Sequence, residues 1–142
     1  KDVTHKYERH QCMVDKQWFV PVNEGLFQVV EAGTARSARC EGITLCGKTG
    51  TAQNPHGDNH SMFAGFAPKD NPKIAIAVVV ENGGYGSDYA APIASLMVEK
   101  YLNDTIQTKR LPLQEKMFNG NLLHKYGVHI NKSATLSTEA IE

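Results

Sequence analysis

Four consecutive residues with the chemistry of a substrate grip stand near the middle of the chain: Lys48, Thr49, Gly50 and Thr51. A lysine attracts anionic groups, and a threonine hydroxyl donates a hydrogen bond to a carboxylate. A glycine has no side chain, so the backbone of a ligand can approach it closely. A backbone N–H at this place can also face a developing oxyanion. These residue types indicate a strand edge that holds an anionic acyl substrate.

The same segment also matches a motif for binding nucleotide phosphate. Residues 42–49 satisfy the pattern G-x-x-x-x-G-K-[ST], which requires a strand before the loop and a helix that begins at the lysine. Residues 38–41 are too polar for a buried strand, and residues 43–46 favour extended structure inside the supposed loop. The segment after Lys48 contains glycine and then proline and cannot begin a stable helix. The pattern therefore favours the strand edge.

The composition indicates one domain of ordinary size. The chain has 142 residues, 41% of them hydrophobic, and its 15 Lys and Arg residues balance 15 Asp and Glu residues. This balance predicts no nucleic-acid partner, and no apolar run is long enough to cross a bilayer. The chain begins at Lys1 without an initiator methionine, so we expect a piece of a longer protein.

The cysteines and histidines do not form a metal pattern. The three cysteines are Cys12, Cys40 and Cys46. Their number and spacing favour three buried or half-buried thiols, although a Cys40–Cys46 disulfide is conceivable in an oxidising compartment. His56 and His60 flank Asp58, but no third and fourth ligand stands in register. We therefore expect a solvated loop there and no metal.

Hydrophobic patterning predicts an α+β fold. The expected elements are a helix over about 22–33, a strand over 43–48, strands over 61–67 and 74–80, and a helix over 91–102. Three strands joined by short turns, with helices before and after them, predict an antiparallel β-sheet covered by helices. The patterning decays after about Asp104. We expect a domain portion at residues 1–104 and a peripheral or flexible C-terminal extension at 105–142.

Extended structure over residues 43–52 would place alternate side chains on opposite faces of the sheet. Lys48 and Gly50 would share one face, and Thr49 and Thr51 the other, unless a bulge re-aims them. A K-T-G tripeptide alone is weak evidence, because an ordinary strand can end in such a turn. The longer pattern around it is more specific.

That longer pattern resembles the C-terminal part of the transpeptidase domain of a class B penicillin-binding protein, of the penicillin-binding protein 2 type. The family motifs are S-x-x-K, S-x-N and K-T-G, and the third stands here at residues 48–50. It is followed at family-like spacing by residues 61–68 and 74–84, and residues 22–35 look like the family's helix before the K-T-G strand. The resemblance covers roughly residues 15–103 and implies an incomplete part of a penicillin-binding/β-lactamase-like fold.

The first two family motifs are absent from this chain. No serine is followed by lysine three positions on or by asparagine two positions on. By the resemblance, the nucleophile and its lysine base would lie upstream of Lys1. Acyl transfer needs a nucleophile, a base and oxyanion donors within hydrogen-bond reach, so we expect this chain to be inactive alone.

The resemblance implies that the intact parent is a serine-type peptidoglycan D,D-transpeptidase and an antibiotic target, with no cofactor. Its partners would be the peptidoglycan stem peptide, β-lactams and other cell-wall synthesis proteins, at the periplasmic face of the inner membrane. Lys48 would support the hydrogen-bond network and attract the terminal carboxylate of the substrate. Thr49 and Thr51 would contact that carboxylate, the Thr51 amide would complete the oxyanion hole, and Gly50 would permit close approach.

The alternative is a noncatalytic cell-wall interaction module that keeps the same sheet without the chemistry. Serine motifs encoded upstream of Lys1 would favour the enzyme, and their absence would favour the module.

Overall fold

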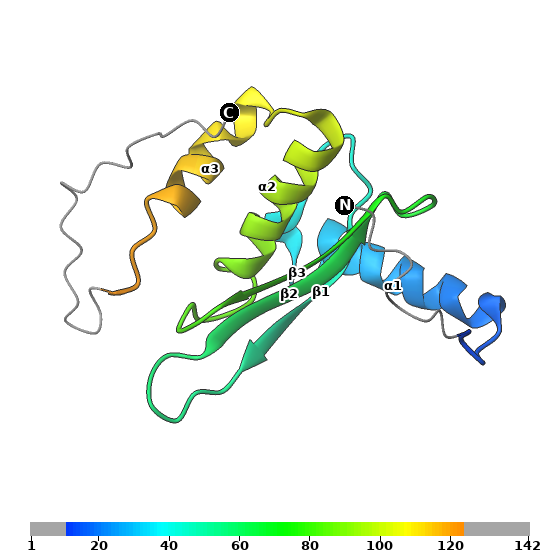
Figure 1. The fold of residues 1–142 in the computed structure, drawn as a ribbon, viewed down its shortest axis with the longest axis horizontal. Coiled ribbons are helices and arrows are strands. Elements are labelled where there is room, and N and C mark those ends of the chain that lie inside the picture. The colour runs from blue at the N-terminus through cyan, green and yellow to red at the C-terminus, as the bar shows by residue number, and fades with distance from the viewer. Residues whose placement is uncertain (1–10, 124–142) are drawn as a thin grey trace, which may run out of the picture.

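A computed structural model describes residues 11–123 of the chain (Figure 1). Its three strands, β1 (Cys46–Ala52), β2 (His60–Ala67) and β3 (Ile74–Val80), form one antiparallel sheet in the order β1-β2-β3. The helices are α1 (Phe19–Glu31), α2 (Ala90–Asn103) and α3 (Leu111–Phe118), with short 3-10 turns η2 (Lys16–Trp18), η3 (Arg36–Ala38) and η4 (Thr108–Arg110). The predicted α+β class is confirmed. None of the helices described is long and apolar enough to span a membrane.

Helix α1 begins earlier than predicted. Pro21 lies in its first turn, where its missing N–H removes no helical hydrogen bond and its fixed φ suits a helix. The helix therefore extends back to Phe19, ahead of the apolar spacing that begins at Val22. Its last turn carries Val30, which is buried in the core. In its first half, the Asn23 carbonyl accepts a hydrogen bond from the Cys46 thiol, at 3.6 Å, and this ties α1 to the start of β1.

Strand β1 begins later than predicted. Ile43 does not continue the strand: it forms an isolated bridge with Cys40 across a tight turn in which Gly42 has a φ of 81°, a value that glycine adopts without strain. Ile43 and Leu45 are buried. Their apolar character therefore serves the core, and the paired strand starts only at Cys46.

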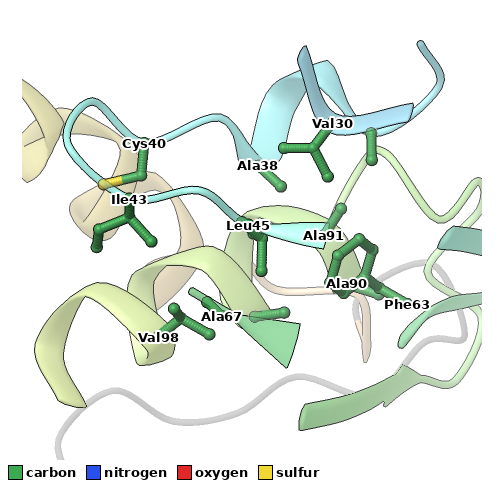
Figure 2. Packing of buried hydrophobic residues seen from close by; sticks show 12 residues of the cluster. Val30, Ala38, Cys40, Ile43, Leu45, Phe63, Ala67, Ala90, Ala91 and Val98 are labelled. Carbon is green, nitrogen blue, oxygen red and sulfur yellow. The ribbon is translucent and has the colours of Figure 1, made fainter. Parts of the chain in front are cut away.

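One face of the sheet packs against α2. Thr49, Phe63 and Val78 lie opposite one another on the three strands and share this face. Phe63 is buried in the core, and Val78 packs against it. The facing side of α2 is lined with alanines, and Figure 2 shows Ala90 and Ala91 close to the Phe63 ring. These small residues allow the helix to lie close to the sheet.

The other face of the sheet carries Lys48, Ala64 and Ala77, which lie opposite one another on the three strands. In the part of the chain that the structure describes, this face is largely open, and Val79 on it is 58% exposed. We call it the open face. Leu26 of α1 reaches only one end of it, where it helps to line a hollow of about 570 Å³.

Beyond α2, the chain turns back and packs against that helix through η4 and α3 (Figure 1). Arg110 is buried there, with Nε 3.4 Å from Glu99 Oε2 and an amino group donating to Ser95 Oγ at 2.6 Å. The predicted domain boundary coincides with the end of α2, where Asp104 is left-handed with a φ of 56°. Residues 1–10 and 124–142 of the two predicted segments lie outside the described residues, and the division itself stays a prediction.

Candidate functional site

The four residues singled out from the sequence lie side by side on β1. Strand β1 is at one edge of the described sheet, since it pairs with β2 and with no other described strand. Alternate N–H and C=O groups of an edge strand point away from its partner and are free to pair with an added peptide. No helix begins at Lys48, because β1 continues through Ala52. The phosphate-loop alternative therefore does not fit this backbone.

The predicted alternation of side chains is present. Lys48 and Gly50 lie on the open face, opposite Ala64 and Met62, whereas Thr49 lies opposite Phe63 on the face toward α2. The Lys48 side chain is exposed, and its ammonium group donates to the Thr49 carbonyl at 2.9 Å. Two hollows of about 570 and 210 Å³ on the open face both include Lys48 in their lining. A ligand or a further part of the protein on this face would therefore meet the lysine.

Close packing explains why glycine stands at positions 47 and 50 of β1 and at position 65 of β2, which the K-T-G motif alone did not indicate. A Cβ at Gly47 would come 2.8 Å from Cε2 of Phe63, and a Cβ at Gly65 would come 2.9 Å from Cε1 of the same ring. The Phe63 ring thus occupies a slot between two glycines on neighbouring strands. A Cβ at Gly50 would lie 3.2 Å from the Met62 Cβ, so even a methyl group there would crowd the open face.

Two residues that the sequence analysis did not assign to the site contact Thr49. The Oγ1 atoms of Thr34 and Thr49 are 2.8 Å apart, and Gly86 lies so close that a Cβ on it would come 2.8 Å from the Thr49 Cβ. The sequence signal for Thr34 was its place in residues 22–35, the segment that resembles the family's helix before the K-T-G strand. Gly86 was visible only as one of several glycines that break the pattern after β3.

The described serines are all engaged in hydrogen bonds within the fold. Ser61 is buried, donates to the Tyr85 carbonyl at 2.8 Å and accepts from the Ala90 N–H at 3.1 Å, which ties β2 to the start of α2. Ser95 donates to the Pro92 carbonyl at 2.8 Å. Ser37 donates to the Ser87 carbonyl, also at 2.8 Å. No described serine is hydrogen-bonded to a lysine, which is the contact that activates the nucleophile in a serine–lysine pair.

Hydrogen bonds among two asparagines and a histidine connect the strand ends beside the site. Asn54 donates to the Asn82 side chain at 2.7 Å, and the Asn82 N–H donates to His60 Nδ1 at 3.0 Å. The expectation of a solvated loop is wrong for His60, which begins β2 and is half-buried, and it holds for His56, which is exposed. The described residues contain no cluster of three or more potential metal ligands.

The cysteines are free thiols. Cys40 and Cys46 are buried without a disulfide between them, and burial raises the pKa of both thiols, which disfavours the reactive thiolate. The expectation of a buried or half-buried thiol is wrong for Cys12, which is exposed ahead of η2. The raised pKa of Cys40 and Cys46 is the opposite of what a catalytic cysteine needs.

An ion pair joins α1 to the turn between β2 and β3. The Lys69 ammonium group pairs with Glu24 and lies 4.8 Å from the centroid of the Phe27 ring. Hydrogen bonds from Gln28 and then from Lys69 lower the pKa of the Glu24 carboxyl, and the bond to Glu24 raises the pKa of Lys69. This contact helps to fix α1 beside the end of the open face.

Comparison with known proteins gives the family. The model of the penicillin binding protein transpeptidase domain matches residues 3–99. The peptidoglycan D,D-transpeptidase MrdA of Haemophilus influenzae is 36% identical over 134 residues, which cover 82% of this chain and 18% of that protein. MrdA of Acinetobacter baumannii is 33% identical over 126 residues, which cover 77% of this chain and 18% of that protein. The chain thus spans less than one fifth of the length of these relatives.

Solved structures agree in fold and in sequence. Pseudomonas aeruginosa PBP2 in complex with WCK 5153 matches with a TM-score of 0.58 and 37% identity, over 70% of this chain and 23% of that chain. Penicillin-binding protein A from M. tuberculosis, in an imipenem acyl-enzyme complex, matches with a TM-score of 0.58 and 31% identity, over 66% of this chain and 21% of that chain. The chain belongs to the penicillin-binding protein transpeptidase family and corresponds to part of the transpeptidase domain of a class B member.

Proposed function

We propose that this chain forms the K-T-G wall of the active site in a peptidoglycan D,D-transpeptidase that works through a serine acyl-enzyme. The observation that carries the proposal is the position of residues 48–51 on an edge strand of the sheet that the structure describes, with Lys48 on the open face. Penicillin-binding protein A, a structural relative, has been captured as an imipenem acyl-enzyme, which supports β-lactams as ligands here. No cofactor takes part.

The reaction that this wall would serve is acyl transfer. The serine oxygen attacks the carbonyl carbon of the substrate's D-Ala-D-Ala peptide bond, the terminal D-alanine leaves with a proton, and an amine of a neighbouring strand then displaces the serine. Lys48 attracts the terminal carboxylate and supports the hydrogen-bond network around the reacting groups. Thr49 and Thr51 contact that carboxylate, and the Thr51 amide stabilises the oxyanion that forms at the attacked carbonyl.

The nucleophile belongs to another part of the protein, and the open face is where that part would meet Lys48. By itself, the 142-residue chain therefore remains unlabelled by a fluorescent penicillin. We further propose that the whole protein acts at the periplasmic face of the inner membrane, together with other cell-wall synthesis proteins. Relatives named as peptidoglycan D,D-transpeptidases support the part of this proposal that concerns cell-wall synthesis.

The test is Lys48→Ala in the longer protein to which this chain is proposed to belong. Acylation by fluorescent penicillin falls by about 10²-fold or more, because removing one group that stabilises the reacting charge has an effect of that order. Lys116→Ala is the matched control, since Lys116 is an exposed lysine of α3, and it leaves acylation unchanged. Wild-type acylation by Lys48→Ala would refute the role of the lysine. An unmodified protein that never becomes acylated would favour the noncatalytic interaction module instead.

A further inference from the structure

The hydroxyl group of Thr49 has a partner outside the strand. Thr34 lies in the turn between α1 and η3, and its Oγ1 is 2.8 Å from Thr49 Oγ1 across a separation of 15 residues. Thr34 is exposed and Thr49 is half-buried, so the pair sits at the surface where a ligand can reach it. Each hydroxyl has one proton and two acceptor sites. Only one of the two can therefore donate within the pair.

The backbone around Thr34 is fixed on α1. The Ala35 N–H donates to the Val29 carbonyl at 3.0 Å, and Ala35 is fully buried. On the other side, Gly33 lies against the last turn of the helix, where a Cβ would come 2.8 Å from the Val29 Cα. Thr34 therefore projects from a rigid corner rather than from a free loop.

The Thr49 side chain also packs against the loop that follows β3. Gly86 packs against β1 so closely that a Cβ on it would come 2.8 Å from the Thr49 Cβ and 2.7 Å from the Gly50 carbonyl oxygen. The main chain of Thr49 is held opposite Phe63 in the ladder between β1 and β2. Among the described residues, Thr34 is the hydrogen-bond partner of the Thr49 hydroxyl, and either oxygen of the pair can be the donor.

We propose that Thr34 is a positioning residue that aims the Thr49 proton at the substrate carboxylate; this inference rests on the proposed function, in which Thr49 contacts that group. Thr34 donates its proton to Thr49 Oγ1 and occupies an acceptor site there. The Thr49 proton is then free for the ligand. A hydroxyl that accepts one hydrogen bond donates a stronger one. A carboxylate that accepts the Thr49 proton therefore favours the arrangement in which Thr34 donates to Thr49 and Thr49 donates to the ligand.

The experiment is a double-mutant cycle in the longer protein, read as the second-order rate constant for acylation by benzylpenicillin. Thr34→Val keeps the shape of the side chain and removes its hydroxyl, and it lowers the rate constant about tenfold, the upper range expected for one net hydrogen bond. Thr34→Ser restores the hydroxyl and the rate. In a Thr49→Val background, Thr34→Val has no further effect, because its action passes through the Thr49 hydroxyl.

The control for the loss of a threonine hydroxyl is Thr108→Val. Thr108 is an exposed threonine of η4, outside the K-T-G strand and its neighbours, and the same substitution there leaves acylation unchanged. An equal loss from Thr34→Val with and without the Thr49 hydroxyl would overturn the inference, because it would show that Thr34 acts through the fold. Wild-type acylation by Thr34→Val would also overturn it, with the proposed function intact. An unmodified protein that benzylpenicillin does not acylate would overturn both.

Discussion

Gly86, in the loop that follows β3, packs tightly against the K-T-G strand β1 and its neighbour β2, and alanine at this position should disturb both. Alanine there would place its Cβ 2.7 Å from the Gly50 oxygen and 2.8 Å from the Thr49 Cβ, and closer still to the Met62 carbonyl oxygen. These neighbours are backbone or backbone-linked atoms of two paired strands, so they cannot rotate away. Either the loop after β3 or the strand pair must move.

The size of the effect follows from this overlap. Forcing extra volume into a packed site costs about 1–3 kcal/mol, and each kcal/mol shifts the melting temperature of a domain near 142 residues by about 4 °C. We therefore expect Gly86→Ala to lower the melting temperature of the chain by about 4–12 °C, measured by circular dichroism. Because the displaced atoms carry Thr49 and Gly50, acylation of the longer protein by penicillin should fall as well.

Gly25→Ala is the matched control for Gly86→Ala. Gly25 lies inside α1, and a Cβ there would meet nothing within 4 Å. Alanine in a helix interior is favoured over glycine by about 0.5–1 kcal/mol, so this variant should be slightly more stable than the wild type. A Gly86→Ala chain that unfolds at the wild-type temperature would show that the contact between the loop and β1 is not closed as described.

Two further predictions concern charges away from the site. Arg110→Ala should destabilise the chain by about 3–5 kcal/mol in urea unfolding, because it leaves the fully buried Glu99 without its charge partner. As a control, Arg39→Ala removes a largely exposed ion pair with Glu31 and should lower the free energy of unfolding by less than about 1 kcal/mol. Equal losses in the two variants would contradict the buried pair. The lowered pKa of Glu24 means that its ionised form stabilises the fold above the usual carboxyl pKa, and this stabilisation is lost as the pH falls through the lowered folded-state pKa. Glu24→Gln should therefore melt below the wild type at neutral pH and converge with it in acid, whereas parallel melting curves across that range would argue against the ion pair with Lys69.

Part of the site could be predicted by reading the chain, because it depends on local preferences. Residues near Lys48 favour extended structure, and the glycine and proline that follow exclude a helix, so the K-T-G segment had to be a strand. Alternation along a strand then fixed which side chains share the face of Lys48. The absence of S-x-x-K and S-x-N was likewise plain from the letters alone.

The partners of these residues could not be predicted, because they are set by packing between distant segments. Nothing local indicates that Thr34 meets Thr49, or that Gly86 fits against both β1 and β2. The late start of β1 has the same origin, since burial of Ile43 and Leu45 in the core overrides their preference for extended pairing. The polar segment after Asp104 gave no sign that Arg110 would be buried against Glu99 and anchor it to α2.

The sequence by itself therefore determined the three strands, the helices before and after them, their order and the family, because backbone preference and motif spacing are properties of neighbouring residues. Helix α3 was not predicted. Only the tertiary structure decided that the Thr34 hydroxyl bonds to Thr49 and that Gly86 packs against it. It also decided which face of the described sheet is the open face that carries Lys48. Those contacts arise when helix, sheet and turn are brought together, and their distances depend on how side chains from separate segments fill the same space.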